Sequence, residues 1–219
     1  MPTTPSVLIS DFDGTMTSRD FYSLVSEQLL TPETPDYWAQ YQNGEITHFE
    51  ALRNIFAAVP AGEDAFAELA QQTGLDPELP TQVKALRDAG WEVIVVSAGC
   101  RWYIEKLLTQ QGLDLPIHAS PGRMVQGRLV MELPSDSPYL SVQTGIDKAA
   151  AVRAALARGA RVAYAGDGPV DLKPALLVPP QLRFARDSLA QALRDQGERF
   201  RPFERWSDIA HALLAEPRA

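Results

Sequence analysis

Two aspartates, Asp11 and Asp13, follow the short apolar stretch 7–9 within the run DFDGT. Alternate residues of an extended strand point to the same face, so we expect both carboxylates on one side. Two carboxylates this close need a compensating cation, and hard oxygen ligands suit Mg²⁺. The pair therefore predicts phosphoryl transfer, with Asp11 as an ionised nucleophile and Asp13 as a general acid and then a general base.

Further polar segments follow in the order that this chemistry needs. The segment 97–99 (SAG) comes after the apolar run 93–96, Lys148 opens a helical pattern, and Asp167 comes after the apolar run 163–165. In an open parallel sheet, ligands bind beyond the carboxyl ends of the strands, so we expect these segments to meet at one edge. Together they predict a single site.

The phosphate-binding groups are predicted around Lys148 and the 97–99 segment. A lysine at a helix N-terminus opposes the helix macrodipole, so a functional role explains Lys148 better than a structural one. Ser97 would donate its hydroxyl to the phosphoryl group. The backbone amides of Ala98 and Gly99, which we expect to open the next helix, would favour the anion.

Three supporting residues complete the predicted site. Gly14 would let the backbone turn sharply and approach the phosphate closely, and Thr15 would hydrogen-bond near Asp11. Asp171, one helical turn beyond Asp167, would hold metal-bound water or Lys148. Asp167 is expected as a protein ligand of the Mg²⁺.

Composition narrows the class of protein. A chain of 219 residues is long enough for a core with an inserted domain, and its longest apolar runs are of strand length. One cysteine, Cys100, excludes an internal disulfide and predicts a small buried residue. A net charge of −8 disfavours nucleic acid and anionic membranes as partners. We expect a cytoplasmic protein that acts on a small phosphorylated metabolite; the pattern leaves the oligomeric state open.

Strands alternating with amphipathic helices predict a parallel α/β sheet, with the segments 92–96, 161–165 and 175–178 beside the first strand. The stretch from 17 to 76 is helical in pattern and is predicted to be a cap domain inserted after the first strand. Residues 1–16 and 77–219 would then form the catalytic core. Within the core, the run MVQGRLV at 124–130 predicts a hairpin.

Over residues 7–178 the chain resembles the haloacid dehalogenase superfamily, specifically its aspartate-nucleophile phosphatases. The runs DFDGT, SAG and GDGPVD, together with Lys148, carry the resemblance. It implies a Rossmann-like core with a helical cap of the C1 type and hydrolysis through an aspartyl-phosphate. It also implies that Mg²⁺ is held by Asp11, by the backbone carbonyl of Asp13 and by Asp167.

Within this superfamily the motifs resemble the phosphoserine phosphatase-like branch. The stretch from Asp11 to Asp20 is similar to the methionine-salvage phosphatases that act on a methylthio-ketopentenyl phosphate, which is the leading expected substrate. Phosphoserine is the alternative, because Asp20 matches an acidic position that binds the substrate ammonium. The arginine that holds the phosphoserine carboxylate has no clear counterpart. Candidates for substrate contact are Asp20, Phe21, Arg53 and Arg101.

Aromatic residues of the predicted cap have two interpretations. Tyr37, Trp38 and Tyr41 recur at helical spacing, which is typical of packing and also of a roof over the substrate. His48 is expected to be a residue at a helix entry.

Two other classes of function share part of the pattern. A phospho-accepting regulatory protein also combines Asp, Ser or Thr and Lys at sheet ends, but its phosphorylated Asp usually lies on a later strand. A dehalogenase would not need the proton that Asp13 carries. Turnover of a phosphate ester, as opposed to stable labelling, separates these classes.

Overall fold

The structure, a computed structural model, describes residues 5–215. The strands of its main sheet are β1 (Ser6–Ser10), β2 (Trp91–Cys100), β3 (Ile117–Ser120), β8 (Arg161–Gly166), β9 (Arg183–Ala185) and β10 (Arg201–Pro202). They pair in the order β10-β9-β8-β1-β2-β3, and every pairing is parallel. The predicted parallel α/β fold is confirmed. No helix of the described part of the chain is long and apolar enough to cross a membrane.

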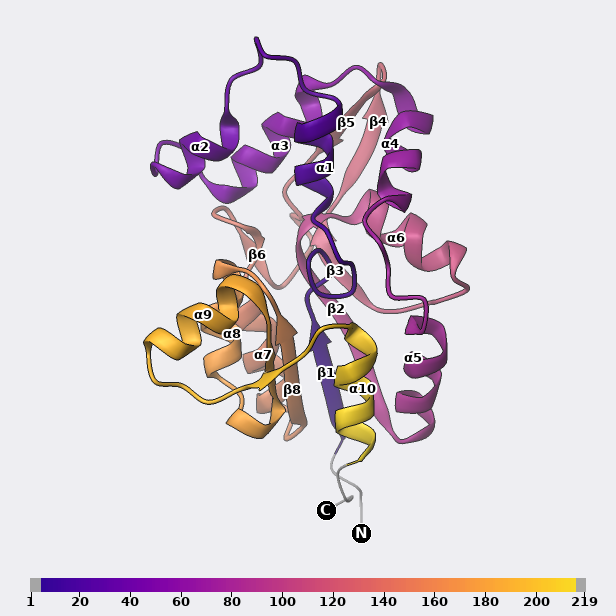
Figure 1. Cartoon of the computed structure of the whole chain (residues 1–219), viewed down its shortest axis with the longest axis vertical. Coiled ribbons are helices and arrows are strands. Elements are labelled where there is room, and N and C mark those ends of the chain that lie inside the picture. The colour runs from indigo at the N-terminus through magenta and orange to yellow at the C-terminus, as the bar shows by residue number, and fades with distance from the viewer. Residues whose placement is uncertain (1–4, 216–219) are drawn as a thin grey trace.

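The central strand β1 divides the helices into two layers. Leu8 packs into a core with α5 (Leu79–Asp88), α6 (Arg101–Gln110) and α10 (Trp206–Leu214). Val7 and Ile9 pack on the other face with α7 (Lys148–Ala157), α8 (Leu172–Leu176) and α9 (Asp187–Asp195). Each of these β1 side chains is at most 1% exposed, and burial of one such side chain contributes about 1.5–3 kcal/mol. Figure 1 shows the two layers on either side of β1 and β8.

Four helices lie beyond the carboxyl edge of the sheet, at the top of Figure 1. They are α1 (Phe21–Gln28), α2 (Tyr37–Gln42), α3 (His48–Ala58) and α4 (Gly62–Gln71). The segments that lead into and out of this group meet at an isolated antiparallel bridge between Thr17 and Leu75. Both residues lie at the ends of the segment 17–76 for which the sequence predicts a cap.

The predicted hairpin is present as β4 (Gly122–Val125) and β5 (Arg128–Met131). Its turn residues have positive φ, 48° at Gln126 and 74° at Gly127. The hairpin packs on the helices above the sheet, since the Arg128 guanidinium donates to the carbonyl of Ala57 at 2.6 Å. The hairpin belongs to the segment predicted as core, but it packs against the helices of the predicted cap. A second short hairpin, β6 (Leu140–Ser141) and β7 (Gly145–Ile146), precedes α7.

The prediction of a strand at 175–178 is wrong. Ala175 lies in α8, and the strand in this part of the chain is β9, whose Arg183 pairs with Tyr164 of β8. Arg183 is 3% exposed and donates to the carbonyls of Ala175 and Val178 at 2.8 and 3.0 Å. A buried arginine that binds the end of the preceding helix makes β9 less apolar than a sheet strand usually is, so hydropathy favours the wrong segment.

Candidate active site

The loop after β1 presents Asp11 and Asp13 to one cavity, although not by strand alternation. The strand ends at Ser10, and the carbonyl of Phe12 then accepts hydrogen bonds from the amides of Thr15, Met16 and Thr17 at 2.8–3.2 Å. The chain therefore turns tightly after Asp11. Both carboxylates reach the cavity because of this turn, which corrects the expectation of an extended strand across the pair.

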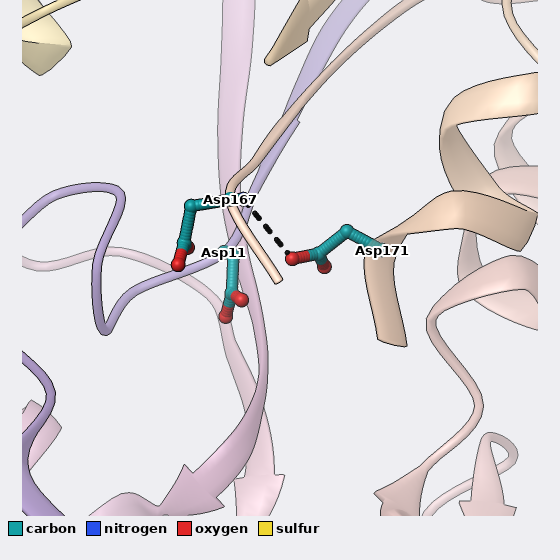
Figure 2. Close-up of side chains that lie close together, drawn as sticks. All are labelled: Asp11, Asp167 and Asp171. Atoms are coloured by element: carbon teal, nitrogen blue, oxygen red, sulfur yellow. Dashed lines mark hydrogen bonds between the residues drawn. The ribbon is translucent and has the colours of Figure 1, made fainter. Parts of the chain in front are cut away.

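Three carboxylates converge at the carboxyl end of β1 and β8. Asp11, Asp167 and Asp171 each place an oxygen within 4.8 Å of the others. Figure 2 shows the three side chains and the hydrogen bond from the Asp167 amide to Asp171. Lys148, 3% exposed, forms ion pairs with both Asp11 and Asp171.

Asp171 accepts hydrogen bonds from four groups of the protein around it. It receives the Lys148 ammonium at 2.7 Å, the Tyr164 hydroxyl at 2.5 Å, and the amides of Asp167 and Gly168 at 3.1 and 2.9 Å. Burial alone would raise its pKa, but Lys148 and these donors lower the pKa below the ordinary value. Of the two roles predicted for Asp171, the structure shows the contact with Lys148.

Asp11 is a buried carboxylate with an excess of negative charge around it. Burial and the Asp171 carboxylate raise its pKa well above the ordinary value, and Lys148 opposes this. Burial disfavours the charge of Lys148, but Asp11 and Asp171 outweigh burial and raise the Lys148 pKa. One oxygen of Asp11 accepts the Phe12 amide at 2.7 Å, and the other faces Lys148.

Asp167 lies directly over Gly14. The Thr15 hydroxyl donates to Asp167 at 2.7 Å, which differs from the contact near Asp11 that the sequence predicts. Gly14 has a φ of +64°, and a Cβ there would lie 2.3 Å from an Asp167 carboxylate oxygen. Burial, and next the Asp171 carboxylate, raise the pKa of Asp167 to about 8.

Asp13 is held by two donors from different elements. The Phe21 amide at the start of α1 donates to one carboxylate oxygen at 3.0 Å, and the Tyr103 hydroxyl of α6 donates to the other. Burial, and next the negative charge of Asp20, raise the pKa of Asp13 to about 7. A carboxyl group with this pKa can both release and take up a proton near neutral pH.

The segment 97–99 differs from the prediction, because it is the end of strand β2. We expected Ala98 and Gly99 to open a helix, but β2 continues to Cys100 and α6 begins at Arg101. The Gly99 amide donates a hydrogen bond to Ser97 Oγ at 3.0 Å, so this amide already has an acceptor within the segment. Ser97, Ala98 and Gly99 still line the cavity.

The cavity above these residues has a volume of about 360 Å³. Its floor is polar and comes from the strand ends. Its roof comes from the helices above the sheet and consists of Tyr22, Trp38, Tyr41, Gln42, His48, Leu52 and Phe56. Trp38 and Tyr41 thus lie in the roof, one of the two interpretations that their spacing allows.

The candidate specificity residues fall in different places. Asp20 lines the cavity, whereas the Phe21 side chain is fully buried against Tyr103, 4.2 Å between ring centroids. Arg53 is exposed on α3 and its guanidinium lies 5.7 Å from the centre of the Phe49 ring. Arg101 is also exposed and pairs with Glu105 at 3.5 Å. Neither arginine is among the residues that line the cavity.

The donor set fits a divalent cation such as Mg²⁺. Asp11 and Asp167 contribute oxygen ligands, and burial, followed by the nearby Asp171 carboxylate, raises the pKa of both. Hard carboxylate oxygens with room for water are the ligands that Mg²⁺ uses in phosphoryl-transfer sites. The side chain of Asp13 is not in the cluster; its predicted contribution is its backbone carbonyl.

Several functional residues escape the sequence analysis. Tyr103 and Tyr164 hold Asp13 and Asp171, and His48, interpreted as a helix-entry residue, lines the cavity. Tyr103 and Tyr164 resemble ordinary core aromatics in sequence, because nothing in their spacing marks the hydroxyl as functional. Cys100 is buried, and burial raises the pKa of its thiol to about 12, as suits a packing residue.

Comparison with curated proteins gives two relatives. The chain is 24% identical over 132 residues to the 2-hydroxy-3-keto-5-methylthiopentenyl-1-phosphate phosphatase of Brevibacillus brevis, covering 59% of this chain and 60% of that protein. It is 24% identical over 147 residues to the phosphoserine phosphatase of Vibrio cholerae, covering 66% of this chain and 44% of that protein. The matched region thus spans less than two thirds of either relative.

Solved structures share the fold at low identity. A haloacid dehalogenase family hydrolase from Salmonella enterica serovar Typhi matches with a TM-score of 0.69 and 15% identity, over 91% of this chain and 68% of that chain. A probable phosphoserine phosphatase from Vibrio cholerae matches with a TM-score of 0.67 and 19% identity, over 98% of this chain and 68% of that chain. The sequence model of the haloacid dehalogenase-like hydrolases matches residues 8–175. This chain therefore belongs to the haloacid dehalogenase-like hydrolase family.

Proposed function

We propose that this protein hydrolyses the phosphate monoester of a small metabolite in a Mg²⁺-dependent reaction. One observation carries the proposal: Asp11, Asp167 and Lys148 converge on the floor of a cavity that the carboxyl group of Asp13 also lines. Phosphate monoesters hydrolyse extremely slowly unaided, so a catalyst must supply a nucleophile, a proton and charge stabilisation together. These residues have the chemistry to supply all three.

In the first step, a carboxylate oxygen of Asp11 attacks phosphorus and the bond from phosphorus to the ester oxygen breaks. The proton of the Asp13 carboxyl group passes to that oxygen, which leaves as an alcohol. The products are an aspartyl-phosphate on Asp11 and an ionised Asp13. The pKa of Asp13, raised to about 7, supports this role, because the group can hold a proton at neutral pH.

In the second step, Asp13 takes a proton from a water molecule whose oxygen attacks the phosphorus of the aspartyl-phosphate. The bond between phosphorus and Asp11 breaks, and inorganic phosphate leaves. Asp11 is again a carboxylate and Asp13 is again protonated. The same two residues thus return to their starting states.

Charge on the phosphoryl oxygens would be stabilised by Lys148, by the Ser97 hydroxyl and by the Ala98 amide. Asp11 and Asp167 would hold Mg²⁺, with the backbone carbonyl of Asp13 as a third ligand, as the family resemblance implies. When bound, Mg²⁺ would neutralise phosphoryl charge and screen Asp11 from the anion. Asp171 would keep Lys148 in place.

The leading substrate is the methylthio-ketopentenyl phosphate on which the Brevibacillus brevis relative acts. The aromatic and aliphatic roof of the cavity supports it, since a methylthio chain is apolar. Phosphoserine is the second candidate, and one observation favours it: Asp20 lines the cavity and could accept an ammonium group.

The test is phosphate release from both compounds and from p-nitrophenyl phosphate, with Mg²⁺ or with a chelator. We expect Mg²⁺-dependent turnover that is lost in Asp11→Asn while the circular dichroism spectrum stays the same. Turnover that survives in Asp11→Asn would remove Asp11 as the nucleophile. Stable labelling of Asp11 without phosphate release would instead indicate a phospho-accepting regulatory protein.

A further inference from the structure

Much of the roof of the cavity is made of aromatic rings in contact with one another, with Gln42 and Leu52 beside them. Tyr22 of α1 stacks on Trp38 of α2 with ring centroids 4.0 Å apart and an angle of 23°. His48, at the start of α3, meets Trp38 and Tyr41 edge-on at 5.6 and 5.2 Å. Leu52 also lines the cavity. This roof suits the apolar part of a ligand whose phosphate lies on the floor.

The charges around the cavity oppose a carboxylate on the ligand. Among the described residues that line it, Lys148 is the only lysine or arginine, and its ammonium already pairs with Asp11 and Asp171. Asp20, which also lines the cavity, would repel an anionic group beside the phosphate. A carboxylate on the organic half would therefore lose its water shell without gaining a cationic partner.

His48 is a polar residue without a function in the steps above. Its Nδ1 is buried and has no hydrogen-bond partner among the described residues. Burial lowers the pKa of the His48 ring to about 4, so the ring is neutral at pH 7. A buried donor without an acceptor is rarer in proteins than a buried acceptor without a donor, so the proton is expected on Nε2. His48 then offers a neutral hydrogen-bond donor on a ring that lines the cavity.

We infer that His48 is a specificity-determining residue that donates a hydrogen bond to a carbonyl or hydroxyl oxygen on the organic half of the substrate. That half is apolar against Trp38 and Tyr41 and carries no carboxylate. The inference rests on the proposed function and extends it from phosphate esters in general to this class. It also separates the two candidate substrates, since phosphoserine carries a carboxylate and the methylthio-ketopentenyl phosphate does not.

The experiment compares an ester that carries the predicted acceptor with one that lacks both the acceptor and the enol double bond, so the readout is the change in their kcat/KM ratio between wild type and variant. One is the methylthio-ketopentenyl phosphate, and the other is 5-methylthiopentyl phosphate, which lacks the keto and hydroxyl oxygens. We expect kcat/KM of the wild-type protein to favour the first, with about tenfold of that ratio due to the hydrogen bond from His48, the effect of one hydrogen bond with a buried partner. In His48→Phe, which keeps an aromatic ring and removes both nitrogens, the ratio should fall about tenfold.

Two conservative variants separate hydrogen bonding from packing. His48→Gln places an amide nitrogen near the position of Nε2 and should retain most of the preference. His48→Asn places its nitrogen nearer to Nδ1 and should lose the preference. A ratio that is the same in wild type and His48→Phe would overturn the inference, as would a higher kcat/KM for phosphoserine than for 5-methylthiopentyl phosphate.

Binding measured without turnover distinguishes failure of the proposed function from failure of the inference about His48. In an Asp11→Asn background, the methylthio-ketopentenyl phosphate is titrated while tryptophan fluorescence reports on Trp38, with Trp38→Phe as the control for the signal. We expect His48→Phe to weaken binding about tenfold. If no ester is hydrolysed but this difference is found, the proposed hydrolysis fails, whereas the hydrogen bond from His48 to the bound ligand stands. If esters are hydrolysed and neither binding nor the kcat/KM ratio changes, the inference alone fails.

Discussion

At the scale of single residues, two glycines determine how closely the reacting groups approach. Gly14 lies under the Asp167 carboxylate, and a Cβ on Gly99 would lie 2.1 Å from the Tyr103 hydroxyl and 2.9 Å from an oxygen of Asp13. No side chain can occupy either position without displacing a functional group. Both positions therefore hold glycine for reasons of space, and Gly14 also because of its positive φ.

Gly14→Ala should weaken the response to Mg²⁺ more than it weakens the fold. The added Cβ would displace Asp167, so we expect the Mg²⁺ concentration for half-maximal activity to rise by about tenfold or more. The control is Gly112→Ala, because Gly112 has a similar φ of +69° with nothing within 4 Å of the added Cβ. Both variants should lose about 1 kcal/mol of folding stability, because alanine is strained at a positive φ. Equal Mg²⁺ responses in the two variants would contradict the prediction.

The negative charge of Asp20 raises the pKa of Asp13, the proposed proton donor. This charge is, after burial, the main cause of the raised Asp13 pKa, so Asp20→Asn should lower that pKa from about 7. In the proposed mechanism Asp13 must be protonated for the first step, and kcat/KM should therefore fall as the pH rises through its pKa. In Asp20→Asn the fall should begin at lower pH than in wild type. A pH profile of kcat/KM with saturating Mg²⁺ measures this, and an unchanged profile would remove Asp20 from that role.

At the scale of elements, the site is assembled by contacts between segments that are distant in the chain. Tyr103 of α6 and the amide of Phe21 in α1 hold the two oxygens of Asp13. Arg186, just before α9, donates to the carbonyls of Gly14 and Thr17 at 2.5 and 2.7 Å. The loop after β1 thus takes its shape from α1, α6 and the start of α9 together.

Tyr103→Phe should shift the pH profile in the opposite direction to Asp20→Asn. The hydroxyl stabilises the ionised form of Asp13, so its removal should raise the Asp13 pKa and move the fall in kcat/KM to higher pH. The ring keeps its packing against Phe21, so the melting temperature should change little. A shift to lower pH would show that Tyr103 does not act on Asp13 in this way.

Arg186→Met should destabilise the protein by about 2 kcal/mol, because it leaves carbonyls of the β1 loop without their charged donor. The side chain of Arg186 is 16% exposed. The control is Arg153→Met, since Arg153 is 56% exposed and pairs with Asp147 at the surface. That variant should change the free energy of unfolding by less than about 1 kcal/mol. Urea unfolding measures both, and equal losses would refute the role of Arg186.

At the scale of the whole molecule, the clustered carboxylates of the site lower the stability of the folded protein. Asp11 and Asp167 both have raised pKa values, which means that their ionised forms are less stable in the folded protein than in the unfolded chain. For Asp167, this destabilisation of the folded state is absent below about pH 4, near the pKa of the group in the unfolded chain. It grows as the pH rises and levels off above about 8.

Asp167→Asn should therefore stabilise the metal-free protein at pH 7, by roughly 1–3 kcal/mol, while it weakens activation by Mg²⁺. Without Mg²⁺ the variant should melt at a higher temperature than wild type. With Mg²⁺ the wild type should gain stability and the variant should gain less, because ligand binding to the folded state raises its stability. Thermal unfolding with chelator and with Mg²⁺ tests both signs, and a less stable metal-free variant would contradict the charge argument.

The sequence by itself determined the α/β class, the order of the motifs and the segment of helices before β2, because each depends on local hydrophobic period and on residues a few positions apart. It failed at β9, where a buried arginine conceals the strand, and at 97–99, where β2 extends beyond its apolar run. Only the tertiary structure decided that Asp171 serves Lys148, that Tyr103 holds Asp13 and that His48 lines the cavity. These roles depend on contacts between residues far apart in the chain, and no local pattern records which partner a buried polar group will meet.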